Sequence, residues 1–331
     1  MVQTSWILSL VTFVTAINAF PQQRLLTRQS DNVPRQYNVV YGFFQQTSPD
    51  TEENFDIDGN NFGLYSNISW SDVTDKIEAL NEKSEDKKYK LIFAARHGEG
   101  YHNVAPDMYS AEDWECYWQI QDGNGEIEWF DASLTPNGEQ QIEKLSGQWQ
   151  EQLKKGTPLP QSYYASPLRR TLQTFELTWT NVSKFDHNDK YKPLVREVAR
   201  ETYGIDSESR RHDKEFIVKN WPFVQLPSDF SDPDPWWSPK ERETGQHRDY
   251  RAELFLNDVF TNDNNQVISL TTHSGFIKSL LKVVNHRKWS MPTGAMIPLI
   301  VEASDFGPFE KPDLDKKWST LPDKCKNYKP S

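Results

Sequence analysis

Short apolar runs, each leading into polar residues, recur along the central part of the chain. Leu91–Ala95 is continuously apolar and leads into Arg96, and Val267–Thr272 leads in the same way into His273. Runs of this length between polar residues are typical of buried strands in a parallel sheet. Two further strands are expected at Tyr163-Tyr164 and Ala295–Glu302.

Amphipathic stretches follow the predicted strands. One helix is expected to start at Thr135-Pro136 and stop at Gly156, a second to start at Ser166-Pro167, and a third to follow His273. This alternation predicts an α/β fold, a three-layer, doubly wound, mostly parallel sheet with loop insertions. The strand ends of such sheets carry the functional sites. We therefore expect Arg96 and His273 to meet at one edge of the sheet.

A segment crowded with Pro, Asp and Trp, Trp221–Arg242, departs from this pattern and predicts an ordered loop insertion. Two interpretations stay open for it. The segment could overhang the site as a lid, or it could be a surface loop packed by its own aromatic side chains.

The N-terminal region has the pattern of a secretory signal. Trp6–Ile17 is an apolar run too short to span a bilayer, and it is followed by the small residue Ala19, although no basic residue precedes it. A buried N-terminal element is the alternative. The expected organisation is a signal peptide (1–19), a polar extension (20–34), a catalytic domain (35–310) and a C-terminal tail (311–331). The protein is then secreted or held at the cell surface.

Charge and cysteine usage narrow the possible functions. The 48 acidic and 37 basic residues give a net charge of -11, which disfavours nucleic acid and anionic membranes as partners. Cys116 and Cys325 are the only cysteines, so a cysteine-based zinc site is excluded. In an oxidising compartment we expect them to pair, the alternative being two free thiols. Asn67 and Asn181 lie in glycosylation sequons, which fits secretion.

The residues after the first predicted strand suit a phosphate group. Neutral imidazole at His97 can attack phosphorus, the Arg96 guanidinium can bind two phosphate oxygens, and Gly98 allows close backbone approach. A metal site at His97, Glu99 and His102 is disfavoured, because the spacing of a metal-binding helix is absent.

Four motifs in the same order resemble the histidine phosphatase superfamily, which includes the phosphoglycerate mutases. They are Arg96-His-Gly98 with Asn103 six residues after the histidine, Asp131–Gln140, Ser166–Thr174 with its two arginines, and Thr272-His-Ser-Gly275. The resemblance implies that His97 is the nucleophile and that Arg96, Arg170 and His273 surround the phosphoryl group. The physical demands of phosphoryl transfer agree, because two arginines and a protonated His273 would stabilise its charge without a metal. Asn103 is expected as a neighbouring phosphate or loop contact, and Ser274 as a further substrate contact.

The resemblance also implies a carboxylic acid that protonates the leaving alcohol. Glu201 is our choice, although it lies three residues before Gly204 where four are usual, and Glu197 is the competitor. The expected function is hydrolysis of a small phosphate ester through a phosphohistidine, with no cofactor and no metal. The alternatives are phosphoglycerate mutase chemistry and a catalytically inactive secreted relative. The oligomeric state is not predicted.

Overall fold

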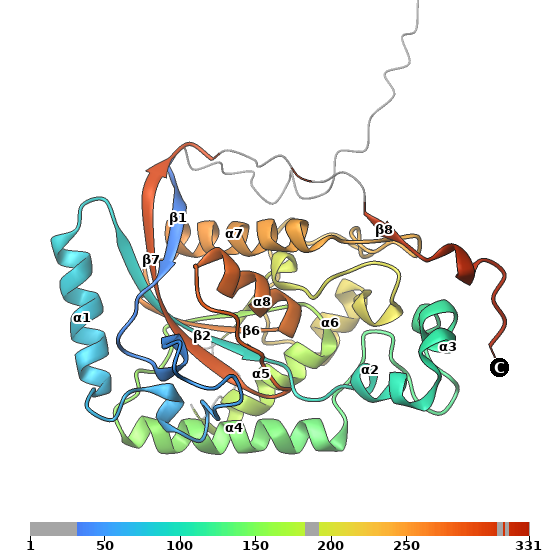
Figure 1. Cartoon of the computed structure of the whole chain (residues 1–331), viewed down its shortest axis with the longest axis horizontal. Helices are drawn as coiled ribbons and strands as arrows, with labels where there is room; N and C mark the ends of the chain where they lie inside the picture. The colour runs from blue at the N-terminus through green and yellow to red at the C-terminus, as the bar shows by residue number, and fades with distance from the viewer. Residues whose placement is uncertain (1–31, 183–191, 310–313, 315–317, 331) are drawn as a thin grey trace, which may run out of the picture.

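A six-stranded mixed sheet forms the centre of the computed structural model, which describes residues 32–182, 192–309, 314 and 318–330 (Figure 1). The strand order is β1 (Val33–Val39), β7 (Met296–Gly307), β2 (Lys88–Arg96), β6 (Val267–Thr272), β3 (Ser162–Ala165) and β4 (Leu194–Val195). The pairs β2/β6, β6/β3 and β3/β4 are parallel, whereas β7 is antiparallel to both of its neighbours. The sheet is therefore mostly parallel, as the sequence predicts.

Helices cover both faces of this sheet. Their bounds are α1 (Trp70–Lys83), α4 (Pro136–Lys154), α5 (Arg169–Val182), α7 (Gly245–Asn262) and α8 (Ser274–Val283). Alternate residues of β2 divide between two cores, since Ile92 packs with α7 and α8, whereas Phe93 packs with α1, α4 and α5. The result is the expected three-layer arrangement.

Several boundaries differ from the sequence-based expectation. β1 begins at Val33, which is buried and paired with Gly307, so the folded domain starts inside the segment assigned to the polar extension. α5 begins at Arg169 instead of Pro167, because the Asp131 carboxylate accepts a hydrogen bond from the Arg169 amide at 2.8 Å. The helices α1 and α7 are not predicted from the sequence. The smaller elements are α2 (Tyr101–Val104), α3 (Ala111–Cys116), α6 (Lys214–Asn220), β5 (Glu241–Arg242) and β8 (Ser319–Thr320).

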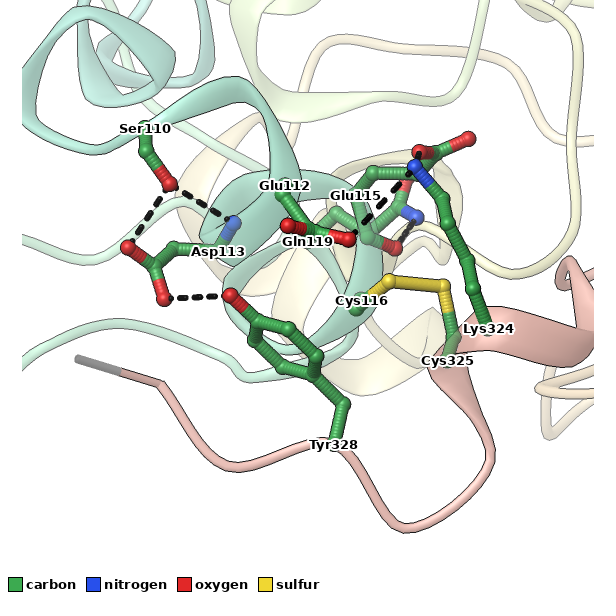
Figure 2. Close-up of a disulfide and its surroundings, with 9 residues drawn as sticks. All are labelled: Ser110, Glu112, Asp113, Glu115, Cys116, Gln119, Lys324, Cys325 and Tyr328. Carbon is green, nitrogen blue, oxygen red and sulfur yellow. Dashed lines mark hydrogen bonds and ion pairs between the residues drawn. A yellow bond between two sulfur atoms is a disulfide. The ribbon is translucent and has the colours of Figure 1, made fainter.

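A disulfide joins the C-terminal tail to α3 (Figure 2). Cys116 and Cys325 are bonded, and the Tyr328 hydroxyl donates to the Asp113 carboxylate at 3.0 Å. Lys324 pairs with Glu115 at 2.7 Å, so covalent, polar and ionic contacts hold the same short segment. The tail is fixed on the side of the molecule that carries α2 and α3 (Figure 1).

The loop Trp221–Arg242 is ordered and packs on the body of the protein. Trp236 is buried, and the Trp237 indole donates to the Asp206 carbonyl at 2.8 Å. Asp234 binds Arg200 at 2.6 Å. These contacts favour the aromatic surface loop over a free lid.

The signal peptide and its cleavage point lie outside the described residues. Within the described residues, none of the helices has the length and apolarity that a membrane crossing requires. Both sequon asparagines, Asn67 and Asn181, are exposed, so glycosylation at these positions stays a prediction.

Candidate active site

His97 lies directly after β2, and its neighbours fix the state of its ring. The ring Nδ1 is 2.7 Å from the Gly98 carbonyl, which can only accept a hydrogen bond, so Nδ1 carries the proton. The other nitrogen, Nε2, then holds a free electron pair. His97 is 2% exposed, and its backbone is held by Thr272 and Gly294. The nucleophile predicted from sequence is thus buried, oriented and in the tautomer that attack requires.

Two glycines allow α4 to approach the His97 loop. A Cβ on Gly98 would lie 2.5 Å from the Gly138 carbonyl, and a Cβ on Gly138 would lie 2.0 Å from the Glu99 carbonyl. Thr135 caps α4 and also donates to the Glu99 carboxylate at 2.7 Å. The need for glycine at position 98 therefore comes from helix packing, in addition to the phosphate approach that the sequence predicts.

Arg170 in the first turn of α5 is fully buried. Its Nη1 donates to the Glu208 carbonyl at 2.9 Å, and its Nη2 lies 2.7 Å from the Glu208 carboxylate. That second contact is an ion pair without hydrogen-bond geometry, because neither atom has a hydrogen-bond partner within the described part of the chain. Burial raises the pKa of Glu208 despite Arg170, and the nearby Glu201 and Asp131 raise it further.

His273 precedes α8 and faces His97 across the parallel pair β2/β6. The two ring centroids are 5.1 Å apart, and His273 Nε2 is 2.8 Å from the Ser166 hydroxyl. A third ring, that of His102, lies 5.2 Å from His97. Three imidazoles therefore surround the space next to Arg170.

The three imidazoles are neutral in this environment. Burial is the largest cause that lowers the pKa of His97, His102 and His273 well below the ordinary value, followed by the Arg170 charge. A neutral His97 is the form that can attack phosphorus. The lowered pKa of His273 runs against the expectation that this residue is protonated, because burial and the Arg170 charge both oppose a second cation there.

Glu201 lies at the N-terminus of α8. Its carboxylate accepts hydrogen bonds from the Gly275 amide at 2.9 Å and the Thr202 amide at 2.8 Å. A Cβ on Gly275 would lie 1.9 Å from this carboxylate, so a larger residue there would displace the Glu201 side chain from its present position. Arg96 is close enough for Glu201 to raise the pKa of its guanidinium, although burial lowers that pKa more.

The competing carboxylate, Glu197, is committed elsewhere. It is buried and pairs with Arg200 at 3.2 Å and Arg211 at 2.6 Å. This placement favours Glu201 as the acid, since both carboxylate oxygens of Glu197 are already paired with arginines.

Other predicted contacts have different local roles. Asn103 accepts a hydrogen bond from the Gly100 amide at 3.0 Å and so caps α2. Ser274 is the first residue of α8, next to His273. Within the described ranges, no group of three or more His, Cys, Asp or Glu side chains is arranged to hold a metal ion.

The most informative feature is a set of buried polar atoms without hydrogen-bond partners in the described part of the protein. Five of the unpartnered atoms are nitrogens around His97, namely Arg96 Nε, His102 Nδ1, Arg170 Nε, Arg170 Nη2 and His273 Nδ1. Buried polar groups in native proteins are normally paired, so a cluster of exceptions requires an explanation. An oxyanion with several acceptor oxygens is the complementary ligand.

Comparison with known proteins identifies the family. The sequence profile of the histidine phosphatase superfamily (branch 1) matches residues 120–297. Phosphomutase-like protein 3 of Candida albicans is 43% identical over 295 residues, which cover 88% of this chain and 87% of that protein. The chain belongs to the histidine phosphatase superfamily.

Other relatives of this superfamily member are named for mutase chemistry. A protein of Arthroderma benhamiae named "Probable phosphoglycerate mutase" is 34% identical over 297 residues, covering 84% of this chain and 88% of that protein. The solved phosphoglycerate mutase of Thermus thermophilus is 19% identical, covers 65% of this chain and 98% of its own, and has a TM-score of 0.34. Family membership confirms the resemblance and the fold class predicted from the sequence. Members of this superfamily are phosphatases or mutases acting on small phosphate-containing substrates.

Sequence reasoning missed Glu208 as a contact of Arg170 and Ser166 as a partner of His273, and it gave His102 no place at the phosphate. Glu208 lies in a short polar stretch without periodicity, so nothing distinguishes it from a surface residue. The sequence pattern indicates a helix cap at Ser166, whereas its hydroxyl lies against the second histidine. His102 is five residues after His97, a spacing that could have indicated a shared turn.

Proposed function

We propose that this protein is a phosphomonoesterase that works through a phosphohistidine on His97. The observation that supports this most is the cluster of unpartnered buried nitrogens on Arg96, Arg170, His102 and His273. These nitrogens lie beside a neutral imidazole whose Nε2 is free to attack. A phosphoryl group would meet their hydrogen-bonding needs and would be held against the nucleophile.

In the first step, His97 Nε2 attacks the phosphorus atom and the bond from phosphorus to the ester oxygen breaks. The two guanidinium groups, Arg96 and Arg170, stabilise the charge on the phosphoryl oxygens. Glu201 in its protonated form gives its proton to the departing alkoxide. The site then contains a phosphohistidine and, on release of the alcohol, a Glu201 carboxylate.

In the second step, water attacks the phosphohistidine. Glu201 takes one proton from this water, the bond from phosphorus to Nε2 breaks, and inorganic phosphate leaves. The neutral His97 tautomer is restored, because Nδ1 keeps its bond to the Gly98 carbonyl throughout. We also propose that the protein acts outside the cell or at its surface, on the basis of the N-terminal pattern and the two sequons.

The experiment is release of inorganic phosphate from 4-nitrophenyl phosphate between about pH 4 and pH 8, with a chelator present. We expect hydrolysis by the parent protein and none by His97→Ala. Quenching the parent with alkaline detergent should also trap a phosphoryl group on the protein that is stable in base and is lost on later acid treatment, as a phosphoimidazole is. Interconversion of phosphoglycerates without net phosphate release would instead establish a mutase, and no reaction on a panel of esters would support an inactive relative.

A further inference from the structure

A cavity of about 560 Å³ opens beside Arg96. It is lined by residues of the segment Glu53–Asp58, by residues of Trp289–Pro292 and by Ala295 and Met296 at the start of β7. A cavity of this size holds a small organic group.

The backbone in the wall of this cavity is hydrogen-bonded to Arg96 and His97 of the candidate active site. The Met291 carbonyl accepts a hydrogen bond from Arg96 Nη1 at 2.7 Å, and the Ala295 carbonyl accepts one from the Arg96 amide at 2.9 Å. Between these two residues, the Gly294 amide donates to the His97 carbonyl at 2.9 Å. A group bound in the cavity would therefore contact the same segment that fixes the nucleophile and the first arginine.

The lining has a distinctive composition. Phe55 and Trp289 supply aromatic surface, and Ile57, Met291 and Met296 supply aliphatic surface. The charged lining residues among those described are the carboxylates Glu53, Asp56 and Asp58 together with Arg96. Because Arg96 is assigned to the phosphate, the rest of the cavity combines apolar surface with negative charge.

We propose that this cavity binds the leaving group of the ester, and that it selects an aromatic or apolar alcohol that is neutral or positively charged. The proposal rests on the proposed phosphomonoesterase function and narrows its substrate class. Carboxylates at Glu53 and Asp56 attract a cation and repel an anion, and Phe55 provides an aromatic ring beside them. Polyphosphorylated alcohols and carboxylated ones, such as a phosphoglycerate, are disfavoured for the same reason.

Asp58 strengthens the preference for a cation. Burial raises its pKa to about 8, against the Met296 amide that hydrogen-bonds the carboxylate at 3.2 Å and the nearby Lys144. In the empty cavity it is mostly neutral at pH 7, and a bound cation would favour its ionised form. An anionic leaving group would gain nothing from this residue.

The test uses a matched series of aryl phosphates that carry an aminomethyl, a hydroxymethyl or a carboxyl group opposite the phosphate. We expect kcat/KM to be highest for the cationic ester and lowest for the anionic ester. The double variant Glu53→Gln/Asp56→Asn should lower the ratio of cationic to anionic kcat/KM by about tenfold, with little change for the neutral ester. Dividing variant by parent values for each ester cancels its intrinsic reactivity.

A matched control is available a few residues away. Asp50 and Glu52 are exposed carboxylates just before the segment Glu53–Asp58, and they do not line the cavity. Asp50→Asn/Glu52→Gln removes the same charge and should leave the ratio unchanged. Equal changes in both double variants, or no change in the first, would overturn the proposal.

Two further measurements keep the test decisive. Ser290 lines the cavity and is exposed, so Ser290→Trp should narrow the cavity without disturbing the core and should raise KM for all three aryl esters.

If the parent hydrolyses none of the esters, the phosphomonoesterase function fails, and calorimetric binding of the same three esters still reports the order of affinity by charge. Equal binding of all three would reject the subsite independently of turnover.

Discussion

Arg251 and Arg170 are both 0% exposed, but they differ in how many of their guanidinium nitrogens are hydrogen-bonded. The comparison shows how a buried arginine that stabilises the fold can differ from one proposed to bind a ligand. Arg251 on α7 uses every guanidinium nitrogen: Nε and Nη2 bind the Glu243 carboxylate at 2.6 Å each, and Nη1 binds the Val198 and Arg200 carbonyls. Arg170 on α5 leaves Nε and Nη2 without hydrogen-bond partners within the described residues. Arg251 is thus fully hydrogen-bonded within the fold, whereas Arg170 is held by Glu208 and keeps two nitrogens that suit the proposed oxyanion.

The two arginines also contact the two ends of one segment, Glu201–Glu208. Arg251 Nη2 donates to the Glu201 carbonyl at 3.1 Å, whereas Arg170 binds the Glu208 carbonyl. Arg251 thus fixes the backbone that presents the proposed acid, and Arg170 stays available to the phosphate. Arg251 therefore positions the backbone of the proposed site, and Arg170 is the arginine proposed to contact the phosphate.

The largest expected effect comes from removing the partly paired arginine. Arg170→Met should lower kcat/KM for an aryl phosphate by about a thousandfold, because it removes donors that stabilise the transition state. Stability to urea should change little, because Glu208, whose pKa is raised by burial, becomes neutral once its partner Arg170 is removed. Steady-state kinetics and urea unfolding measure the two quantities, and a variant that keeps its activity would contradict the assignment of Arg170 to the phosphate.

The same substitution at the fully paired arginine should do the reverse. Arg251→Met removes the paired cation from the buried Glu243 carboxylate, which keeps its hydrogen bond with His247, and the free energy of unfolding should fall by about 3–5 kcal/mol. Urea denaturation followed by tryptophan fluorescence measures the loss. Unchanged stability would mean that the dense hydrogen bonding of Arg251 contributes nothing to the fold.

An oxyanion should stabilise the protein only when Arg170 is present. Tungstate at about a hundred times its Kd should raise the free energy of unfolding by about 2.7 kcal/mol, because it binds the folded state alone. Thermal unfolding with and without tungstate shows this as a rise in Tm. The rise should vanish in Arg170→Met and persist in Glu197→Gln, whose carboxylate lies in the separate Arg200 and Arg211 network.

The smallest predicted effect concerns pH. The folded-state pKa of Glu208 is raised, so this carboxyl is neutral below that pKa and ionises against Arg170 as the pH rises through it. Sulfate stays dianionic over this range, and its affinity should fall by about tenfold as the Glu208 carboxylate forms and competes for Arg170. Calorimetric titrations across the pH range should show this fall in the parent and a flatter profile in Glu208→Gln. Glu201→Gln should lower kcat and leave the pH dependence of sulfate affinity unchanged. That result would separate the acid role of Glu201 from the effect of Glu208 on sulfate binding.

The sequence predicts the elements whose physical signal is local. Buried apolar runs identify β2 and β6, and His97 and His273 follow from the ends of those runs. Helix α7 is harder to find, because residues around its circumference are buried and its amphipathic pattern is weak. Glu208 could not be predicted, since its role depends on a contact with Arg170, 38 residues away. Local patterns identify the nucleophile, and tertiary contacts decide which charges stay unpaired.

The bond between Cys116 and Cys325 spans a sequence separation of 209 residues and encloses Arg170, Glu201 and His273, while His97 lies outside the loop. A protease that cuts one peptide bond inside this loop leaves two fragments that remain covalently joined. The nicked protein would run as one species on a non-reducing gel and as two after reduction. One bridge therefore keeps the pieces of the proposed site on one molecule after a first cut.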